Sequence, residues 1–267
     1  MTRTGLLLSI LALCGSSVVL AADRLTDRDV KALVARIEQG RDRFDDALDG
    51  KLKHSIVRGP AGEVNVGDYL NDFQENIDRL EERLKPDYAA SAEAGALLRQ
   101  ASAIHRFFRQ QPAGTRGESE WNRLETDLKA LAVAYGADFP LAENATVRRI
   151  GDRELAAAVG EIASTADRLK KSLDNELKKD AAMDKPARQA VVGEADQLSK
   201  DAKVLRDRVR DGKPSTGEAE RVLAGATKLQ TFIDSHRVPA SAAAWTNAGE
   251  PMQTLASAYR VPWPVTK

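Results

Sequence analysis

The sequence has almost no cysteine: Cys14 is the single one among 267 residues. Beyond that position the chain can form no disulfide, no thiolate nucleophile, no cysteine-ligated zinc site and no c-type haem attachment. Such a chain depends on a hydrophobic core for its stability, and it is long enough to bury one.

Aromatic residues, histidine and an excess of charge of either sign are also scarce. The chain has 40 basic and 40 acidic residues, three histidines and 5% aromatic residues. A near-neutral protein lacks the concentrated positive field that binds phosphate backbones, so we expect no nucleic-acid partner. With 30% charged residues and apolar residues at helical spacing, the composition is typical of long, solvated helices.

The first residues have the layout of a secretory signal peptide. Arg3 provides a short basic region, an apolar run extends from Gly5 to Leu20, and small residues follow at Ala21 and Ala22. We therefore expect residues 1–21 to be a signal peptide, with cleavage after Ala21 or Ala22, and the mature chain to be periplasmic or secreted. The apolar run is too short to favour a permanent membrane span, and we expect no integral span in the mature chain.

Lipid anchoring through Cys14 is the alternative for localisation. Lipoprotein cleavage boxes place a small residue immediately before the lipid-accepting cysteine, whereas Leu13 occupies that position here. An ordinary apolar leader residue is therefore the favoured interpretation of Cys14.

The two halves of the chain show the same apolar pattern at one constant offset, the one that separates Val30 from Leu155. In the first expected helix the pairs are Val30 with Leu155, Val34 with Val159, Ile37 with Ile162, Phe44 with Leu169, Leu48 with Leu173 and Leu52 with Leu177. In the next two they run from Val66 with Val191 to Leu84 with Val209, and from Leu97 with Val222 to Phe108 with Ile233. A fourth helix repeats at an offset one residue shorter, pairing Trp121 with Trp245, Leu128 with Met252, Leu131 with Leu255, Tyr135 with Tyr259 and Phe139 with Trp263.

Four matching stripes in the same order predict an all-α fold made by tandem duplication of a four-helix bundle-like unit, with about eight helices in the mature chain. We expect the first unit at residues 22–140, a linker at 141–149 and the second unit at 150–267. Asn65 with Asp68, and Ser215 with Glu218, have the spacing of capping boxes at helix starts. The run from Gly59 to Gly62 is expected to separate the first two helices.

The repeated aromatic residues are the candidate ligand contacts: Trp121, Tyr135, Trp245 and Tyr259. Two rings on one helix face could form platforms for a glycan or an apolar ligand. Leucines lie between them on the same face, however, so the favoured interpretation is that the rings fill the two ends of each bundle.

The sequence predicts no catalytic, cofactor-binding or metal site. His54, His105 and His236 have no histidine at the matching position of the other half, and no Glu-x-x-His pair of a di-iron bundle occurs. Met252 could ligate a haem iron, but its counterpart is Leu128 and a core methionine is favoured.

We therefore expect a non-enzymatic exported helical protein of the cell envelope that binds a protein or another envelope component. The alternative is a small-ligand carrier, with haem, a metal or an apolar molecule enclosed by a bundle. An enzyme is the third hypothesis, which an approach of His105 to acidic side chains in a pocket would favour. Because the halves share core residues and differ in polar ones, the specific function is expected where they differ.

Overall fold

A computed structural model describes residues 24–59, 62–180 and 183–263. The expected signal peptide and Cys14 lie outside these ranges. The described residues form ten α-helices and one two-stranded sheet, so the all-α prediction is confirmed. None of the helices in these ranges has both the length and the apolar character needed to cross a bilayer.

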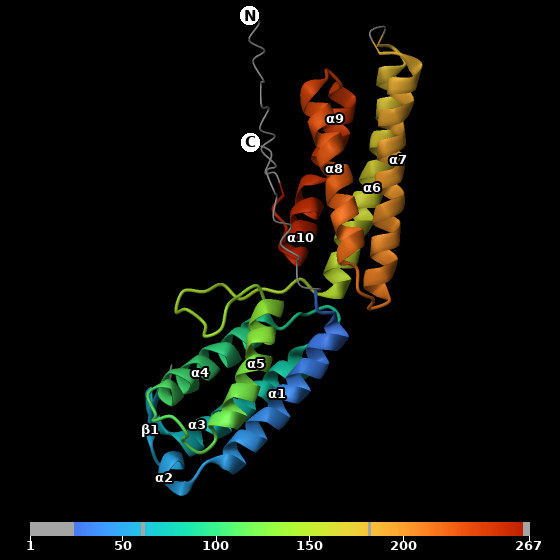
Figure 1. The fold of residues 1–267 in the computed structure, drawn as a ribbon. Coiled ribbons are helices and arrows are strands. Elements are labelled where there is room, and N and C mark those ends of the chain that lie inside the picture. The colour runs from blue at the N-terminus through green and yellow to red at the C-terminus, as the bar shows by residue number, and fades with distance from the viewer. Residues whose placement is uncertain (1–23, 60–61, 181–182, 264–267) are drawn as a thin grey trace, which may run out of the picture.

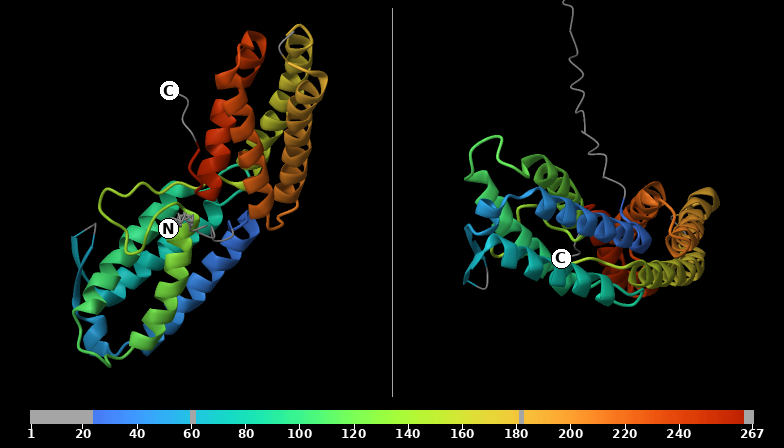
Figure 2. Two further views of the ribbon diagram at one scale, coloured as in Figure 1. Left: turned by 45° about the horizontal axis from the view of Figure 1, so that its top comes forward. Right: turned by 90° about the horizontal axis from the view of Figure 1, so that it is seen from below.

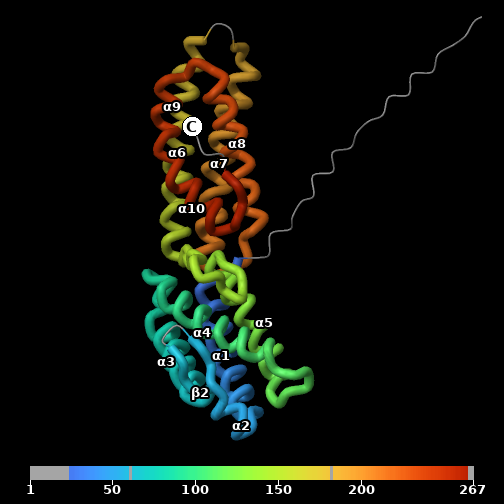
Figure 3. Tube along the Cα trace, turned by 90° about the vertical axis from the view of Figure 1, so that its left-hand side faces the viewer, coloured from blue at the N-terminus to red at the C-terminus, as the bar shows by residue number. Residues whose placement is uncertain are grey.

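The helices form two bundles that lie end to end (Figures 1 and 3). The elements of the first bundle are α1 (Asp27–Ala47), α2 (Gly50–Lys53), β1 (Ile56–Gly59), β2 (Gly62–Asn65), α3 (Val66–Arg83), α4 (Ser91–Arg109) and α5 (Glu118–Ala134). Those of the second are α6 (Asp152–Leu177), α7 (Lys185–Arg210), α8 (Thr216–Ser235), α9 (Pro239–Thr246) and α10 (Gly249–Tyr259).

Each bundle has its own hydrophobic core. One cluster of buried residues extends from Val30 to Leu141, and the other extends from Ile150 to Tyr259. The paired positions of the first expected helix are buried in both bundles, apart from the partly buried Leu52. Burial of such a stripe stabilises each helix, since its apolar face is removed from water along its whole length.

Local sequence sets several helix starts. Thr26 and Asp29 form a reciprocal capping box at α1, and the Asn65 side chain accepts the backbone N–H of Asp68 at α3, as predicted. The expected capping role of Ser215 at α8 is wrong, because its side chain makes no cap hydrogen bond. The Ser215 hydroxyl instead lies 2.7 Å from the Tyr259 hydroxyl, and the two groups share a buried hydrogen bond.

The two bundles differ from each other between the first two helices that the sequence predicts for each unit. Residues 56–59 and 62–65 form the two antiparallel strands of a hairpin in the first bundle, with Val57 opposite Val64. At the matching positions of the second bundle, residues 185–190 belong to the start of α7. Asp184 caps that helix and Pro186 fits its first turn, so α7 begins early.

The predicted fourth helix of the second unit is divided into α9 and α10. Pro251 lacks a backbone N–H, which a helix interior requires but the first turn of α10 does not.

The two bundles meet at the starts of α1 and α6 (Figures 1 and 2). The backbone N–H of Asp27 donates to Asp152 Oδ2 at 2.9 Å, and that of Asp152 donates to Asp27 Oδ2 at 3.1 Å. Each carboxylate also binds an arginine: Arg24 Nη1 lies 2.6 Å from Asp152 Oδ1, and Arg149 forms an ion pair with Asp27.

The same arginines complete the junction through backbone carbonyls. Arg24 Nη2 donates to the carbonyl of Ile150 at 2.7 Å, and Arg149 Nη2 donates to that of Leu25 at 2.9 Å. Each of these bonds therefore has a counterpart, and the two aspartates are 125 positions apart. Arg260 of the second bundle also donates to the Val133 carbonyl of the first bundle, a bond outside this reciprocal set. A self-complementary interface of this kind is the geometry of a two-fold contact between identical subunits, here within one chain.

Candidate functional site

The hairpin, α3 and α4 surround a cavity of about 330 Å³ in the first bundle. This volume lies at the lower end of the range for small-molecule sites. Its lining residues are Gly62, Val64, Tyr69, Asp72, Glu75, Asn76, Arg79, Ala96, Arg99 and Gln100.

The polar floor of this cavity is held in place by hydrogen bonds between α3 and α4. The buried Gln100 side chain accepts a hydrogen bond from Asn76 Nδ2 at 2.5 Å and donates one to the Tyr69 carbonyl at 3.3 Å. The Tyr69 hydroxyl donates to the Gln100 carbonyl at 3.2 Å. Burial raises the pKa of Tyr69, so its phenol keeps this proton. The floor groups are thus fixed before any ligand arrives.

The hairpin is held against the cavity by close packing at Gly59. A Cβ atom at this position would lie 2.3 Å from Tyr69 Cε2, so only glycine allows β1 to approach the ring this closely. The neighbouring strand then presents Val64 to the cavity.

The rim of the cavity is charged. Arg79 and Glu75 pair with each other at 3.1 Å, both largely exposed. Neither the Asp72 carboxylate nor the Arg99 guanidinium makes a hydrogen bond or ion pair with the residues that the structure describes. The Arg99 side chain lies over Gly95, with both terminal nitrogens 3.4 Å from where a Cβ would be. The rim therefore keeps one acidic and one basic group available.

The second bundle does not repeat this cavity. The positions that match Tyr69, Asp72, Asn76, Arg99 and Gln100 at the offset of the repeat are Glu194, Gln197, Asp201, Ala224 and Gly225. The polar residues that line the cavity are thus among those that differ between the two halves.

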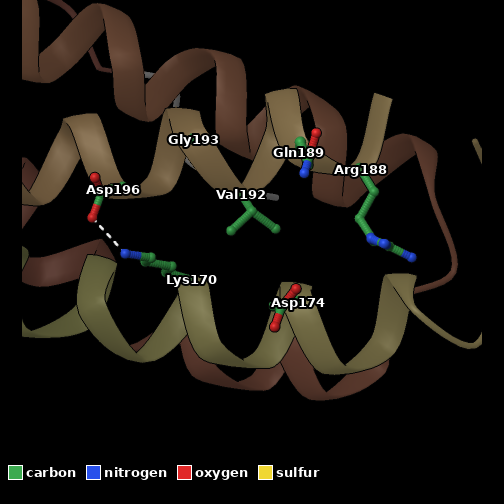
Figure 4. Close-up of a pocket in the computed structure, with 7 residues that line it drawn as sticks. All are labelled: Lys170, Asp174, Arg188, Gln189, Val192, Gly193 and Asp196. Carbon is green, nitrogen blue, oxygen red and sulfur yellow. Dashed lines mark hydrogen bonds and ion pairs between the residues drawn. The ribbon is translucent and has the colours of Figure 1, made fainter. Parts of the chain in front are cut away.

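A second cavity, of about 210 Å³, lies between α6 and α7 (Figure 4). Lys170 reaches across from α6 to Asp196 of α7 at 2.6 Å, and Lys200 binds the other oxygen of this carboxylate at 2.7 Å. These hydrogen bonds lower the pKa of Asp196 to about 2. Lys170 and Asp196 neutralise each other here, whereas the Arg188 guanidinium has no ion-pair partner among the described residues. This cavity is the weaker candidate for a ligand because it is smaller and none of its lining residues is buried.

His105 and Glu125 form a polar cluster between α4 and α5. His105 Nδ1 lies 3.4 Å from Glu125 Oε2, and Lys129 and Arg109 bind the same carboxylate at 2.6 and 3.3 Å. Burial lowers the pKa of His105 more than the charge of Glu125 raises it. Burial acts to raise the pKa of Glu125, but its cationic partners outweigh that effect and hold it below the usual value. Neither residue lines the two cavities described above.

The four candidate aromatic residues are buried. Trp121, Tyr135, Trp245 and Tyr259 are exposed by 5% or less, so none offers an open ring face to a glycan. The tyrosine hydroxyls lie at the junction end of the bundles: Tyr135 donates to the Ala89 carbonyl at 2.7 Å, and Tyr259 contacts Ser215. The rings occupy the bundle interiors.

The other two histidines lie at helix ends. His54 follows α2 with Nδ1 2.5 Å from the Gly50 carbonyl, and His236 follows α8 and stacks on Phe232 with ring centroids 4.0 Å apart. In the described part of the chain no group of three or more histidine, cysteine, aspartate or glutamate side chains could hold a metal ion.

Sequence reasoning did not single out Tyr69, Asn76 or Gln100. The sequence signal that could have found them is a difference in residue type at matching positions of the two halves, such as Gln100 and Gly225, on helices that otherwise match. No family model, curated protein or solved structure matches this chain.

Proposed function

We propose that this chain is a non-enzymatic binding protein of the cell envelope, periplasmic or secreted, that holds its ligand in the cavity between the hairpin, α3 and α4. The observation that carries the proposal is the hydrogen-bonded floor of Asn76, Tyr69 and Gln100 under a rim with an available acid and base. Fixed polar groups in a concave site are what a binding protein uses to orient a ligand.

The lining of the cavity supports binding rather than catalysis. It contains no histidine, serine, threonine or cysteine, and the one phenol already donates its proton to a carbonyl. The lining therefore lacks a hydroxyl or thiol nucleophile with an adjacent imidazole base. His105 does approach the acidic Glu125, but it does so between α4 and α5, outside this cavity.

In this proposal the two bundles, at residues 22–140 and 150–267 with a linker at 141–149, arose by duplication of one unit. The reciprocal bonds of Arg24 with Asp152 and Arg149 with Asp27 support that origin, as do the matched buried stripes. The first copy acquired the hairpin and the cavity, and the second copy supports it as a scaffold.

A small-ligand carrier is the second candidate, favoured by the modest volume of the cavity. Leucine, isoleucine and aromatic side chains of the chain itself fill both bundle cores. A carried molecule would therefore lie under the hairpin rather than along a bundle axis. Native mass spectrometry of protein purified from its own compartment separates the two roles, because a carrier retains a small molecule and an interaction protein retains a partner chain.

The proposal is tested by filling the cavity. Ala96→Trp places an indole in its wall, and Ala224→Trp is the matched control because Ala224 is exposed on the equivalent helix α8. Both variants and the unaltered protein are incubated with envelope extract, and retained molecules are measured by native mass spectrometry and cross-linking. We expect Ala96→Trp alone to lose the retained molecule. Equal retention by all three, or substrate turnover that a histidine substitution abolishes, would contradict the proposal.

A further inference from the structure

The charged rim and the fixed floor of the hairpin cavity define the chemistry of the molecule that fits there. Asp72 and Arg99 come from different helices, α3 and α4, and both line the same cavity. The remaining charged pair of the lining, Glu75 with Arg79, is already closed on itself. Among the residues that the structure describes, the cavity therefore offers one unpaired negative and one unpaired positive group to a single occupant.

Arg99 is the group suited to a carboxylate. A guanidinium presents a planar fork of donors that binds both oxygens of a carboxylate at once. The terminal nitrogens of Arg99 lie beside Gly95 of the same helix, 3.4 Å from where a Cβ of that residue would be.

Asp72 is the group suited to an ammonium. Its carboxylate accepts no hydrogen bond from the described residues, while its backbone carbonyl accepts one from Asn76 Nδ2 at 3.2 Å. Asn76 is thus tied both to Asp72 and to Gln100, which joins the acidic side of the rim to the floor. An occupant with donors at one end finds acceptors on this side.

The rest of the wall is small and apolar. Val64 from the hairpin and Ala96 from α4 line the cavity beside the ring of Tyr69. A cavity of about 330 Å³ has room for a small molecule with a short apolar group.

We infer that this cavity binds a small zwitterion of the α-amino-acid type, with its carboxylate on Arg99, its ammonium on Asp72 and its apolar side chain against Val64 and Ala96. The inference rests on the proposed function, because it names the ligand class of the same site. The second bundle has Gln197 and Ala224 at the matching positions, so one chain binds one zwitterion. A free amino acid and a short peptide share this chemistry, and the experiment distinguishes them.

The test is calorimetric titration of the intact protein with glycine, L-alanine, L-valine, L-leucine and alanylalanine. N-acetyl-L-valine, which lacks the ammonium, and L-valine methyl ester, which lacks the carboxylate, are titrated alongside. The variants are Arg99→Gln and Asp72→Asn, with Arg153→Gln and Glu161→Gln as controls, because the latter two residues are exposed on α6. Each variant removes one charge and keeps a hydrogen-bonding side chain.

We expect a stoichiometry of one and a loss of affinity of about tenfold or more when either charge of the ligand is removed, in line with hydrogen bonds to charged groups. Arg99→Gln should no longer distinguish valine from its ester, and Asp72→Asn should no longer distinguish valine from its N-acetyl form. Tighter binding of alanylalanine than of every free amino acid identifies a peptide as the source, and the reverse identifies a free amino acid.

The zwitterion assignment is overturned if none of the compounds binds the unaltered protein. It is also overturned if the Arg99→Gln and Asp72→Asn variants bind valine as tightly as the unaltered protein does. The proposed function is tested separately, by the Ala96→Trp variant. If no zwitterion binds but Ala96→Trp fails to retain a molecule that the unaltered protein captures from envelope extract, the cavity binds another class of ligand. If Ala96→Trp retains that molecule as well, both the zwitterion assignment and the proposed function are wrong.

Discussion

Asp27 and Asp152 each accept the backbone N–H of the other, so each carboxylate completes the first turn of a helix in the opposite bundle. A carboxylate at a helix start is stabilising because the free N–H groups there carry partial positive charge. The arginines Arg24 and Arg149 compensate the two negative charges and reach across to backbone carbonyls. The reciprocal part of the junction therefore depends on Arg24 and Asp27 at the start of α1 and on Arg149 and Asp152 at the start of α6.

Arg149→Ala should destabilise the protein by about 3 kcal/mol, because it leaves a partly buried carboxylate without its charged partner. The Arg149 side chain is only 3% exposed. Chemical denaturation with the midpoint as readout measures the loss. Arg153→Ala is the control, since Arg153 is exposed on α6, and its effect should stay within about 0.5 kcal/mol.

The double variant Arg149→Ala with Asp27→Ala should lose clearly less stability than the sum of the single variants, because both remove the same ion pair. Additive losses would show that the two side chains act independently, which contradicts the described junction.

The residues that face the two tryptophans, His105 and Gln230, can be exchanged for each other, and the two substitutions should have opposite effects on stability. Trp245 Nε1 donates to Gln230 at 2.6 Å, whereas the buried Trp121 Nε1 has no hydrogen-bond partner in the described part of the chain. His105 occupies the position that matches Gln230. His105→Gln should stabilise the protein by about 0.5–1 kcal/mol, and Gln230→His should destabilise it by about 1 kcal/mol.

Thermal unfolding of both variants measures this, together with the NMR shift of each indole proton. Destabilisation by His105→Gln with an unchanged Trp121 indole shift would contradict the expected new hydrogen bond.

The free energy of unfolding of the first bundle should decrease as the pH is lowered and His105 takes up a proton. Burial lowers the pKa of His105 below its ordinary value of 6.5, so the unfolded chain binds that proton more readily than the folded one. The stabilisation that comes from the neutral His105 side chain is fully present above pH 6.5 and is lost as the pH falls below that value. Denaturation midpoints between pH 7.5 and 5.5 test this, and His105→Gln should flatten the dependence in that interval. An identical slope in both proteins would assign the effect to other groups.

Gly59→Ala should loosen the hairpin and cost about 1–3 kcal/mol, the range for overpacking a tight contact. The added Cβ would lie 2.3 Å from the Tyr69 ring. Gly217→Ala is the matched control, because no atom of the described residues lies within 4 Å of a Cβ at that helical position. Alanine there should stabilise the protein by about 0.5 kcal/mol. Thermal unfolding compares the two, and a neutral Gly59→Ala would mean that the hairpin does not pack on Tyr69 as described.

The helical architecture was predictable because its signal is local. The spacing of Val30, Val34 and Ile37 defines one helix face, and all three residues are buried. The hairpin was missed because each strand has four residues, too few for a clear alternation pattern beside a glycine-rich run. The division of the last helix could have been anticipated from Pro251, which does not fit a helix interior.

The candidate site was predictable only in outline. The expectation that function lies where the halves differ directs attention to Gln100, whose counterpart is Gly225. It does not show that Gln100 meets Asn76 across two helices, because that contact depends on how α3 and α4 pack. The junction had a sequence signal of its own, since Arg24 and Asp27 recur as Arg149 and Asp152 at the offset of the repeat.

The central claim is that the cavity between the hairpin, α3 and α4 is the binding site. Its most direct test is two-dimensional NMR of the isotope-labelled protein before and after addition of envelope extract, with the side-chain amides of Asn76 and Gln100 as reporters. We expect the signals of these two amides and of Val64 to shift, and those of Lys170 and Gln189 in the α6–α7 cavity to stay unchanged. Shifts confined to the α6–α7 cavity, or spread over the second bundle while Asn76 and Gln100 stay in place, would contradict it.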